Sequence, residues 1–101
     1  MNTRRELIQK LRENKGKLRE FGVKRIGIFG SFARDEARED SDVDVVVELE
    51  KGRGTFSNVA RLIEFLENLL GREIDLLTPD SIDTIRLRYV RERIKKEVIY
   101  V

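Results

Sequence analysis

The sequence predicts one small α/β domain, because segments with helical periodicity and segments with strand periodicity follow one another along the chain. Its 101 residues allow a single modest core, to which the 40% of hydrophobic residues contribute. The charged residues, another 40%, are interspersed with Leu, Ile and Val, which is typical of a folded chain. We therefore interpret residues 1–101 as one globular domain.

Two long helices are predicted from the spacing of apolar residues. The first spans residues 3–21; it begins at a capping box, in which Glu6 follows Thr3, and ends at Gly22. The second carries the segment 59–70 and ends at another glycine. Its apolar positions follow the helical period closely: Val59, Leu62, Ile63, Leu66, Leu69 and Leu70.

A third helix is expected to begin near Asp80 or Ser81. Its apolar stripe consists of Ile82, Ile85, Tyr89 and Ile94. On this interpretation Tyr89 packs in the interior, as Phe65 does on the second helix. The last residues, 97–101, are typical of a strand or of a docked tail.

Three strands are predicted from alternating apolar residues. Residues 23–29 form the first, which runs directly into Gly30 and Ser31. Residues 42–50 form the clearest strand, with three valines on one face and two aspartates on the other. Residues 72–78 form a short third strand, which a proline ends.

Composition excludes several kinds of chemistry. The sequence contains no His and no Cys, so a disulfide, a thiol nucleophile, an imidazole base and a Cys/His zinc site are all excluded. No apolar run approaches the roughly 20 residues that span a bilayer, and the first ten residues lack the apolar region of a signal peptide. We expect a cytoplasmic protein without a membrane partner.

Charge is unevenly distributed along the chain. The net charge is +6 over residues 1–25, −8 over residues 26–83 and +4 over residues 84–101. Solvated helix faces would produce this pattern, and so would a cation-binding centre flanked by surfaces that meet an anion or an acidic partner. The basic run near the C-terminus is irregularly spaced and has few aromatic residues, so we do not expect it to bind nucleic acid directly.

Three carboxylates lie on predicted strands. Asp42 and Asp44 are two residues apart on one strand, so their Cα atoms should lie ~6.5–7 Å apart on the same face. Asp75 interrupts an apolar strand and could add a third carboxylate, as a metal ligand or as the base for an attacking hydroxyl. Asp42 alone also fits an exposed position at the start of its strand. Because strands disfavour Asp and an unpaired buried carboxylate is costly, Asp44 and Asp75 as a set point to a bound metal ion.

A Gly-Ser pair directly after the first strand is the second candidate element. A glycine there lets the backbone approach a phosphate, and Ser31 offers a hydroxyl and an amide. By itself the pair is often only a turn, and it is not a P-loop because no Gly-Lys-Ser/Thr follows.

Spacing makes the two elements specific together. Gly30-Ser31, ten further residues and then Asp42-x-Asp44 resemble the nucleotidyltransferase signature of the polymerase beta superfamily. The segment IFGSFARDEAREDSDVDVVVELE and the segments ENLLGREIDLLTPDSI and RLRYVRERIKKEVIYV are similar to the minimal nucleotidyltransferases, the MNT antitoxins that pair with HEPN toxins.

The resemblance implies a fold and a site. It implies a small mixed β-sheet with helices packed mainly on one side. It implies phosphate binding by Gly30, Ser31 and Arg34, with ATP as the donor. It also implies that two Mg²⁺ ions are held by the three carboxylates, Asp42, Asp44 and Asp75.

The implied reaction is transfer of AMP from ATP to a Tyr hydroxyl of a HEPN ribonuclease toxin, which silences the toxin. Two alternatives remain open: a non-catalytic antitoxin that acts by binding, and a nucleotidyltransferase that acts on a small molecule. One departure from the family pattern is Asp35, where the family commonly has Gly. This substitution bears on the turn geometry and places an additional anion near the phosphates.

Overall fold

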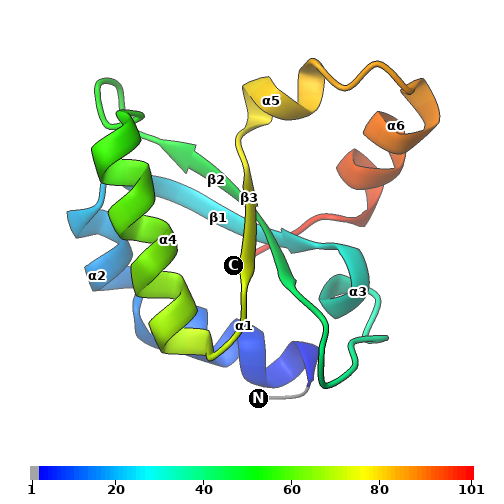
Figure 1. The fold of residues 1–101 in the computed structure, drawn as a ribbon, viewed down its shortest axis with the longest axis horizontal. Helices are drawn as coiled ribbons and strands as arrows, with labels where there is room; N and C mark the ends of the chain where they lie inside the picture. Colours follow the sequence, from blue (N-terminus) through cyan, green and yellow to red (C-terminus); the bar gives the residue numbers. More distant parts are fainter. Residues whose placement is uncertain (1–2) are drawn as a thin grey trace.

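The computed structural model describes residues 3–101, and its centre is a four-stranded mixed sheet (Figure 1). The strand order is β3-β2-β1-β4. β1 pairs antiparallel with both β2 and β4, whereas β2 pairs parallel with β3. The strand bounds are Val23–Phe29 for β1, Val43–Leu49 for β2, Ile74–Leu77 for β3 and Ile99–Tyr100 for β4.

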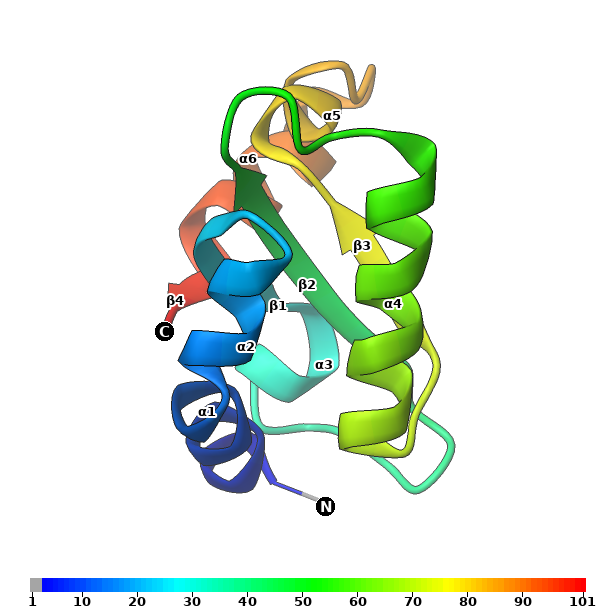
Figure 2. The same ribbon diagram turned by 90° about the vertical axis from the view of Figure 1, so that its left-hand side faces the viewer.

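Helices cover both faces of this sheet unequally. Figure 2 shows α1, α2 and α4 in front of the sheet, with α5 and α6 behind it. The helix bounds are Arg4–Glu13 for α1, Lys15–Glu20 for α2, Gly30–Ala33 for α3, Phe56–Leu70 for α4, Pro79–Asp83 for α5 and Arg88–Glu97 for α6. The expected mixed sheet with helices mainly on one side is confirmed. No helix within residues 3–101 is long and apolar enough to cross a membrane.

The larger apolar core lies between the sheet and the helices α1, α2 and α4. Val43, Val45 and Val47 point into it from β2, and Leu62 and Leu66 from α4 meet them there. All five side chains are fully buried. α4 ends where predicted, because Gly71 adopts a left-handed conformation at φ 67° that terminates the helix.

A smaller apolar cluster lies on the opposite face, beneath α5 and α6. It contains Phe29 from β1, Val46 from β2, Ile82 from α5 and Ile94 from α6. β2 thus buries alternate side chains in two different cores, as its period of two requires. The face of β2 that carries Asp44 therefore also carries the buried Val46.

The first predicted helix is interrupted. At Asn14 the backbone leaves the helical region, with φ −111° and ψ 18°, and the chain forms α1 and α2 in place of one helix over residues 3–21. The Asn14 side chain donates to the carbonyl of Lys10 at 2.8 Å, which is the local bonding by which Asn competes with helix continuation.

The predicted third helix is also divided. α5 ends at Asp83 and α6 begins only at Arg88. The apolar residues of the predicted stripe therefore do not share one face of a single helix. Tyr89 is 72% exposed, so its assignment to the interior is wrong. Phe65 is confirmed as a packing residue, because it lies against Phe21 with ring centroids 5.4 Å apart.

Candidate functional site

The turn after β1 brings the backbone close to a carboxylate. Gly30 adopts φ 70°, a left-handed conformation that favours glycine. A Cβ atom at this position would overlap Oδ2 of Asp44. Phe29, one residue earlier, is the register partner of Asp44 on β2. Gly30 and Asp44, which are 14 positions apart in the sequence, are thus in contact in the fold.

The carboxylates of two neighbouring strands lie side by side. Asp44 on β2 and Asp75 on β3 are register partners in the parallel pairing. Their neighbours Val43, Val45 and Ile74 point into the larger core, so both aspartates lie on the opposite face of the sheet. Asp44 is half-buried and Asp75 is exposed. The structure therefore brings together the predicted pair across two strands.

Asp42 lies just before β2, in the loop that follows α3. Arg72 holds this loop, since its guanidinium donates to the carbonyl of Arg38 at 2.7 Å and to that of Ser41 at 2.8 Å. The Asp42 side chain is exposed. Within residues 3–101 no three acidic, His or Cys side chains gather closely enough to form a ready-made metal-binding group, but Asp42 is near enough for its charge to act on Asp44.

The surroundings of Asp44 disfavour the ionised form of its carboxylate. The pKa of Asp44 is raised to about 6, mainly by burial and then by the charge and the hydrogen bond of the adjacent Asp75 carboxylate. The charges of Asp42 and Glu97 act in the same direction. A carboxylate whose ionised form is disfavoured in this way would gain from a nearby cation.

The donor set fits a hard divalent cation. Asp44 and Asp75 present carboxylate oxygens, which are the ligands that Mg²⁺ prefers. Burial of Asp44 and the charge of Asp75 beside it both disfavour the ionised form of Asp44, and a bound cation would offset both effects.

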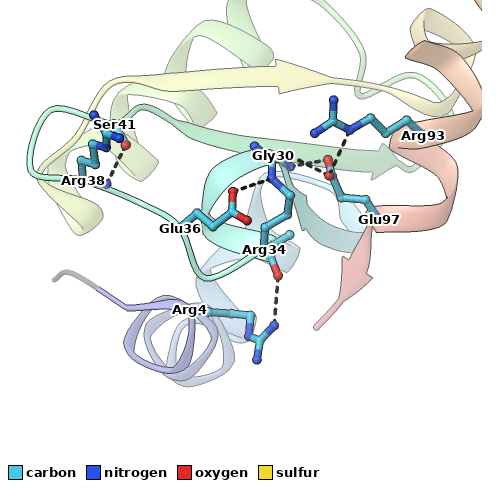
Figure 3. A network of polar contacts seen from close by, with 9 residues as sticks. Arg4, Gly30, Arg34, Glu36, Arg38, Ser41, Arg93 and Glu97 are labelled. Carbon is cyan, nitrogen blue, oxygen red and sulfur yellow. Dashed lines mark hydrogen bonds and ion pairs between the residues drawn. The ribbon is translucent and has the colours of Figure 1, made fainter. Parts of the chain in front are cut away.

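Glu97 is a residue of this site that the sequence did not single out (Figure 3). Its Oε2 accepts the N–H of Gly30 at 2.8 Å, and its Oε1 accepts from the Arg34 guanidinium at 2.7 Å. Burial by itself would raise the pKa of Glu97, but the hydrogen bonds from Arg34 and Gly30 lower it below its usual value. Glu97 is therefore ionised at neutral pH.

The other predicted phosphate-binding residues lie around the same turn. Ser31 follows Gly30 in α3, and its carbonyl accepts the N–H of Glu36 at 2.8 Å. Arg34, directly after α3, also pairs with Glu36 at 3.2 Å. Gly30, Ser31 and Arg34 thus surround one end of the sheet next to Asp44.

Asp35 keeps the turn that a glycine would form. Its backbone is left-handed at φ 58°, a conformation that Asp tolerates better than most residues. The Asp35 carboxylate accepts the backbone N–H of Arg4 at 3.2 Å, and the Arg4 guanidinium donates to the carbonyl of Ala33 at 3.0 Å. The Asp35 carboxylate is therefore engaged with the start of α1.

A family model and the sequences of related proteins point to the same family. Residues 4–101 match the nucleotidyltransferase domain family. A Methanocaldococcus jannaschii protein named "Putative protein adenylyltransferase" is 41% identical over 103 residues and covers 100% of both chains. The protein adenylyltransferase MntA of Thermococcus cleftensis is 40% identical over 102 residues, covering 100% of this chain and 98% of that protein.

Solved structures agree with the fold. One described as a "putative minimal nucleotidyltransferase" superposes with a TM-score of 0.75 at 37% identity, covering 96% of this chain and 94% of its own. A chain from a toxin-antitoxin structure with AMP-PNP gives a TM-score of 0.62 at 18% identity, covering 99% of this chain and 72% of its own. The chain described here belongs to the nucleotidyltransferase family, as an enzyme domain of its minimal type.

Proposed function

We propose that this chain transfers AMP from ATP to a Tyr hydroxyl of a HEPN-type toxin and thereby acts as its antitoxin. One observation carries the proposal: the Gly30 turn touches Asp44, and Asp44 lies beside Asp75. A backbone able to approach phosphates and a carboxylate pair able to hold a cation therefore form one site. Nucleotidyl transfer needs both groups within reach of one triphosphate.

We assign two groups of residues to the donor nucleotide. Gly30 and Ser31 contribute backbone and hydroxyl donors to the triphosphate, and Arg34 contributes a cation. Asp44 and Asp75 would hold Mg²⁺, with Asp42 completing the set from its loop. Bound Mg²⁺ would neutralise charge on the triphosphate and on the leaving pyrophosphate.

The proposed reaction is a single displacement at the α-phosphate. The acceptor hydroxyl oxygen forms a bond to the α-phosphorus, and the bond from that phosphorus to the bridging oxygen of pyrophosphate breaks. The hydroxyl proton passes to the Asp75 carboxylate, because Asp75 is exposed and an acceptor from outside the chain can reach it. Arg34 balances the negative charge that accumulates on the leaving group.

Relatives support a protein acceptor. The MntA relative at 40% identity is named a protein adenylyltransferase, and two structures of the same fold come from toxin-antitoxin complexes. We therefore propose a toxin as the acceptor and ATP as the donor.

Intact-mass spectrometry tests the proposal. The product of the neighbouring gene, a candidate HEPN-type toxin, is incubated with this protein, ATP and Mg²⁺. We expect added mass in steps of AMP, lost with Asp44→Asn and retained with Asp40→Asn. Asp40 is a suitable control because it is an exposed carboxylate in the same loop as Asp42.

The other outcomes separate the alternatives. A stable complex with no added mass would indicate an antitoxin that acts by binding alone. If no complex forms and no mass is added, transfer to a small molecule is favoured. The same assay checks this alternative with hydroxyl-bearing antibiotics as acceptors. Transfer that survives Asp44→Asn would contradict the assignment of the carboxylate pair.

A further inference from the structure

A carboxylate of the chain itself occupies the donors that we assign to the triphosphate. Glu97 accepts from the Gly30 N–H through one oxygen and from Arg34 through the other, at 2.8 and 2.7 Å (Figure 3). Only 13% of its side chain is exposed. The carboxylate is thus enclosed in the site and not one of many solvated charges on α6.

These contacts compete with a phosphate for the same hydrogens. The Gly30 amide carries one hydrogen, so it cannot donate fully to Glu97 and to a phosphate oxygen together. A fixed negative charge at this place would also repel an incoming triphosphate. A nucleotide that uses Gly30 and Arg34 must therefore first displace Glu97.

We propose that Glu97 is an internal phosphate mimic, which holds the phosphate site closed until a nucleotide displaces it. This inference rests on the proposed function, since it takes Gly30 and Arg34 as ligands of the triphosphate. It adds a regulation of that site: the apparent affinity for ATP equals the intrinsic affinity multiplied by the fraction of molecules in which Glu97 is displaced.

Rotation of the Glu97 side chain is enough to release the two donors, because the backbone next to it makes contacts of its own. The N–H of Val98 donates to the carbonyl of Ile94 at 3.1 Å, and the next residue, Ile99, pairs with Ile28 on β1. Both contacts hold the backbone where α6 passes into β4. The Glu97 side chain can turn about its own bonds without moving the helix.

A second partner for the displaced carboxylate is already in place. The Nε atom of Arg93, one helical turn earlier, lies 3.8 Å from Oε1 of Glu97. Arg93 is 64% exposed, and a hollow of about 440 Å³ extends along this side of α6. When a phosphate takes the Gly30 N–H and Arg34, Glu97 can turn toward Arg93 and remain paired.

Calorimetric titration with ATP and Mg²⁺ tests the mimic. Glu97→Gln keeps the shape of the side chain and removes its charge, so we expect ATP to bind about tenfold more tightly than to the wild-type chain. Adenosine carries no phosphate, so its affinity should not change. Glu92→Gln is the matched control, because Glu92 lies on the same helix and pairs only loosely with Arg91, at 3.9 Å.

Each outcome has a distinct meaning. If Glu97→Gln binds ATP equally or less tightly while the wild-type chain still transfers AMP, the mimic is wrong and the proposed function stands. If neither protein binds ATP and no transfer occurs, the proposed function fails and the mimic fails with it. If Glu97→Gln does not fold, Glu97→Asp takes its place, since the shorter carboxylate cannot reach both donors and should also bind ATP more tightly.

Discussion

The two faces of the sheet differ in what they hold. Beneath α4 the core is apolar, and its buried polar residue, Asn58, donates to the carbonyls of Phe21 at 2.8 Å and Arg53 at 2.7 Å. On the opposite face the apolar cluster is smaller, and the left-handed Gly30 and the Asp44–Asp75 carboxylate pair lie at its edge.

This difference shows how one strand serves both stability and chemistry. β2 directs Val43, Val45 and Val47 into the large core, and the same strand directs Asp44 to the opposite face. The packed face holds the strand in place, so the other face can carry a carboxylate whose ionised form is unfavourable. Substitutions on the two faces should therefore affect stability and nucleotide binding separately.

Leu66→Ala should produce the largest loss of stability. Leu66 is fully buried in the larger core, and truncation of such a leucine lowers the free energy of unfolding by about 3 kcal/mol. Urea denaturation measures this loss. ATP affinity should stay within about twofold of wild type in the folded protein, since the site lies on the other face. A large loss of ATP affinity would contradict the idea that the two faces act independently.

Gly30→Ala should lower stability by about 2 kcal/mol, because an alanine is strained at a left-handed φ. Its Cβ would also overlap Asp44, so ATP binding should be lost in the folded fraction. Thermal unfolding and titration with ATP measure the two effects. Gly16→Ala is the control: it lies in α2 with nothing near its Cβ, and it should be neutral or stabilising.

Asp44→Asn should stabilise the nucleotide-free protein while it abolishes transfer. The pKa of Asp44 is raised to about 6 by burial and by Asp75, so ionisation of Asp44 destabilises the fold above that pH. With allowance for solvent screening, we expect a gain of about 1–2 kcal/mol at pH 8. Near pH 4 Asp44 is already protonated in the fold, so the gain should disappear.

Thermal unfolding at both pH values, in EDTA, measures this effect. An equal gain at pH 4 and pH 8 would contradict the electrostatic explanation and point to a packing effect of the amide.

Asp35→Gly should have the smallest effect. Glycine relieves the left-handed conformation of Asp35, but the variant loses the contact with the Arg4 N–H and makes the unfolded chain more flexible. We expect the free energy of unfolding to change by no more than about 0.5 kcal/mol. A loss above about 1 kcal/mol in urea denaturation would show that the Arg4 contact dominates.

Local patterns predicted the elements whose causes are local. The period of α4 and its terminating Gly71 fixed that helix, and alternation located β2 with Asp44 on the face opposite the larger core. The spacing of Gly30 and Asp44 resembles the nucleotidyltransferase signature, and this resemblance led us to expect both residues in one site. Asp75 was expected nearby only if its strand lay next to β2, which the parallel pairing confirms.

Long-range contacts were missed, because no local pattern records them. Glu97 ends a basic segment and looks like an ordinary surface residue, and only the pairing of β4 with β1 brings it to Gly30. The break between α5 and α6 likewise turns Tyr89 outward despite its helical spacing. Asn14 was a local signal for the break in the first helix. The prediction of one helix over residues 3–21 followed the apolar spacing and did not take this signal into account.

The pairing of β4 with β1 also has a kinetic consequence. It joins Gly27 to Tyr100, which are 73 positions apart in the sequence, and contacts of this kind form late in folding because closing a long loop costs entropy first. β4 contributes only two residues, so we expect it to open locally more often than the whole domain unfolds. Because α6 leads directly into β4, the amide hydrogens of α6 and β4 should exchange with solvent faster than those of α4. The segment that carries Glu97, α6 with β4, would then be the last to form and the first to open.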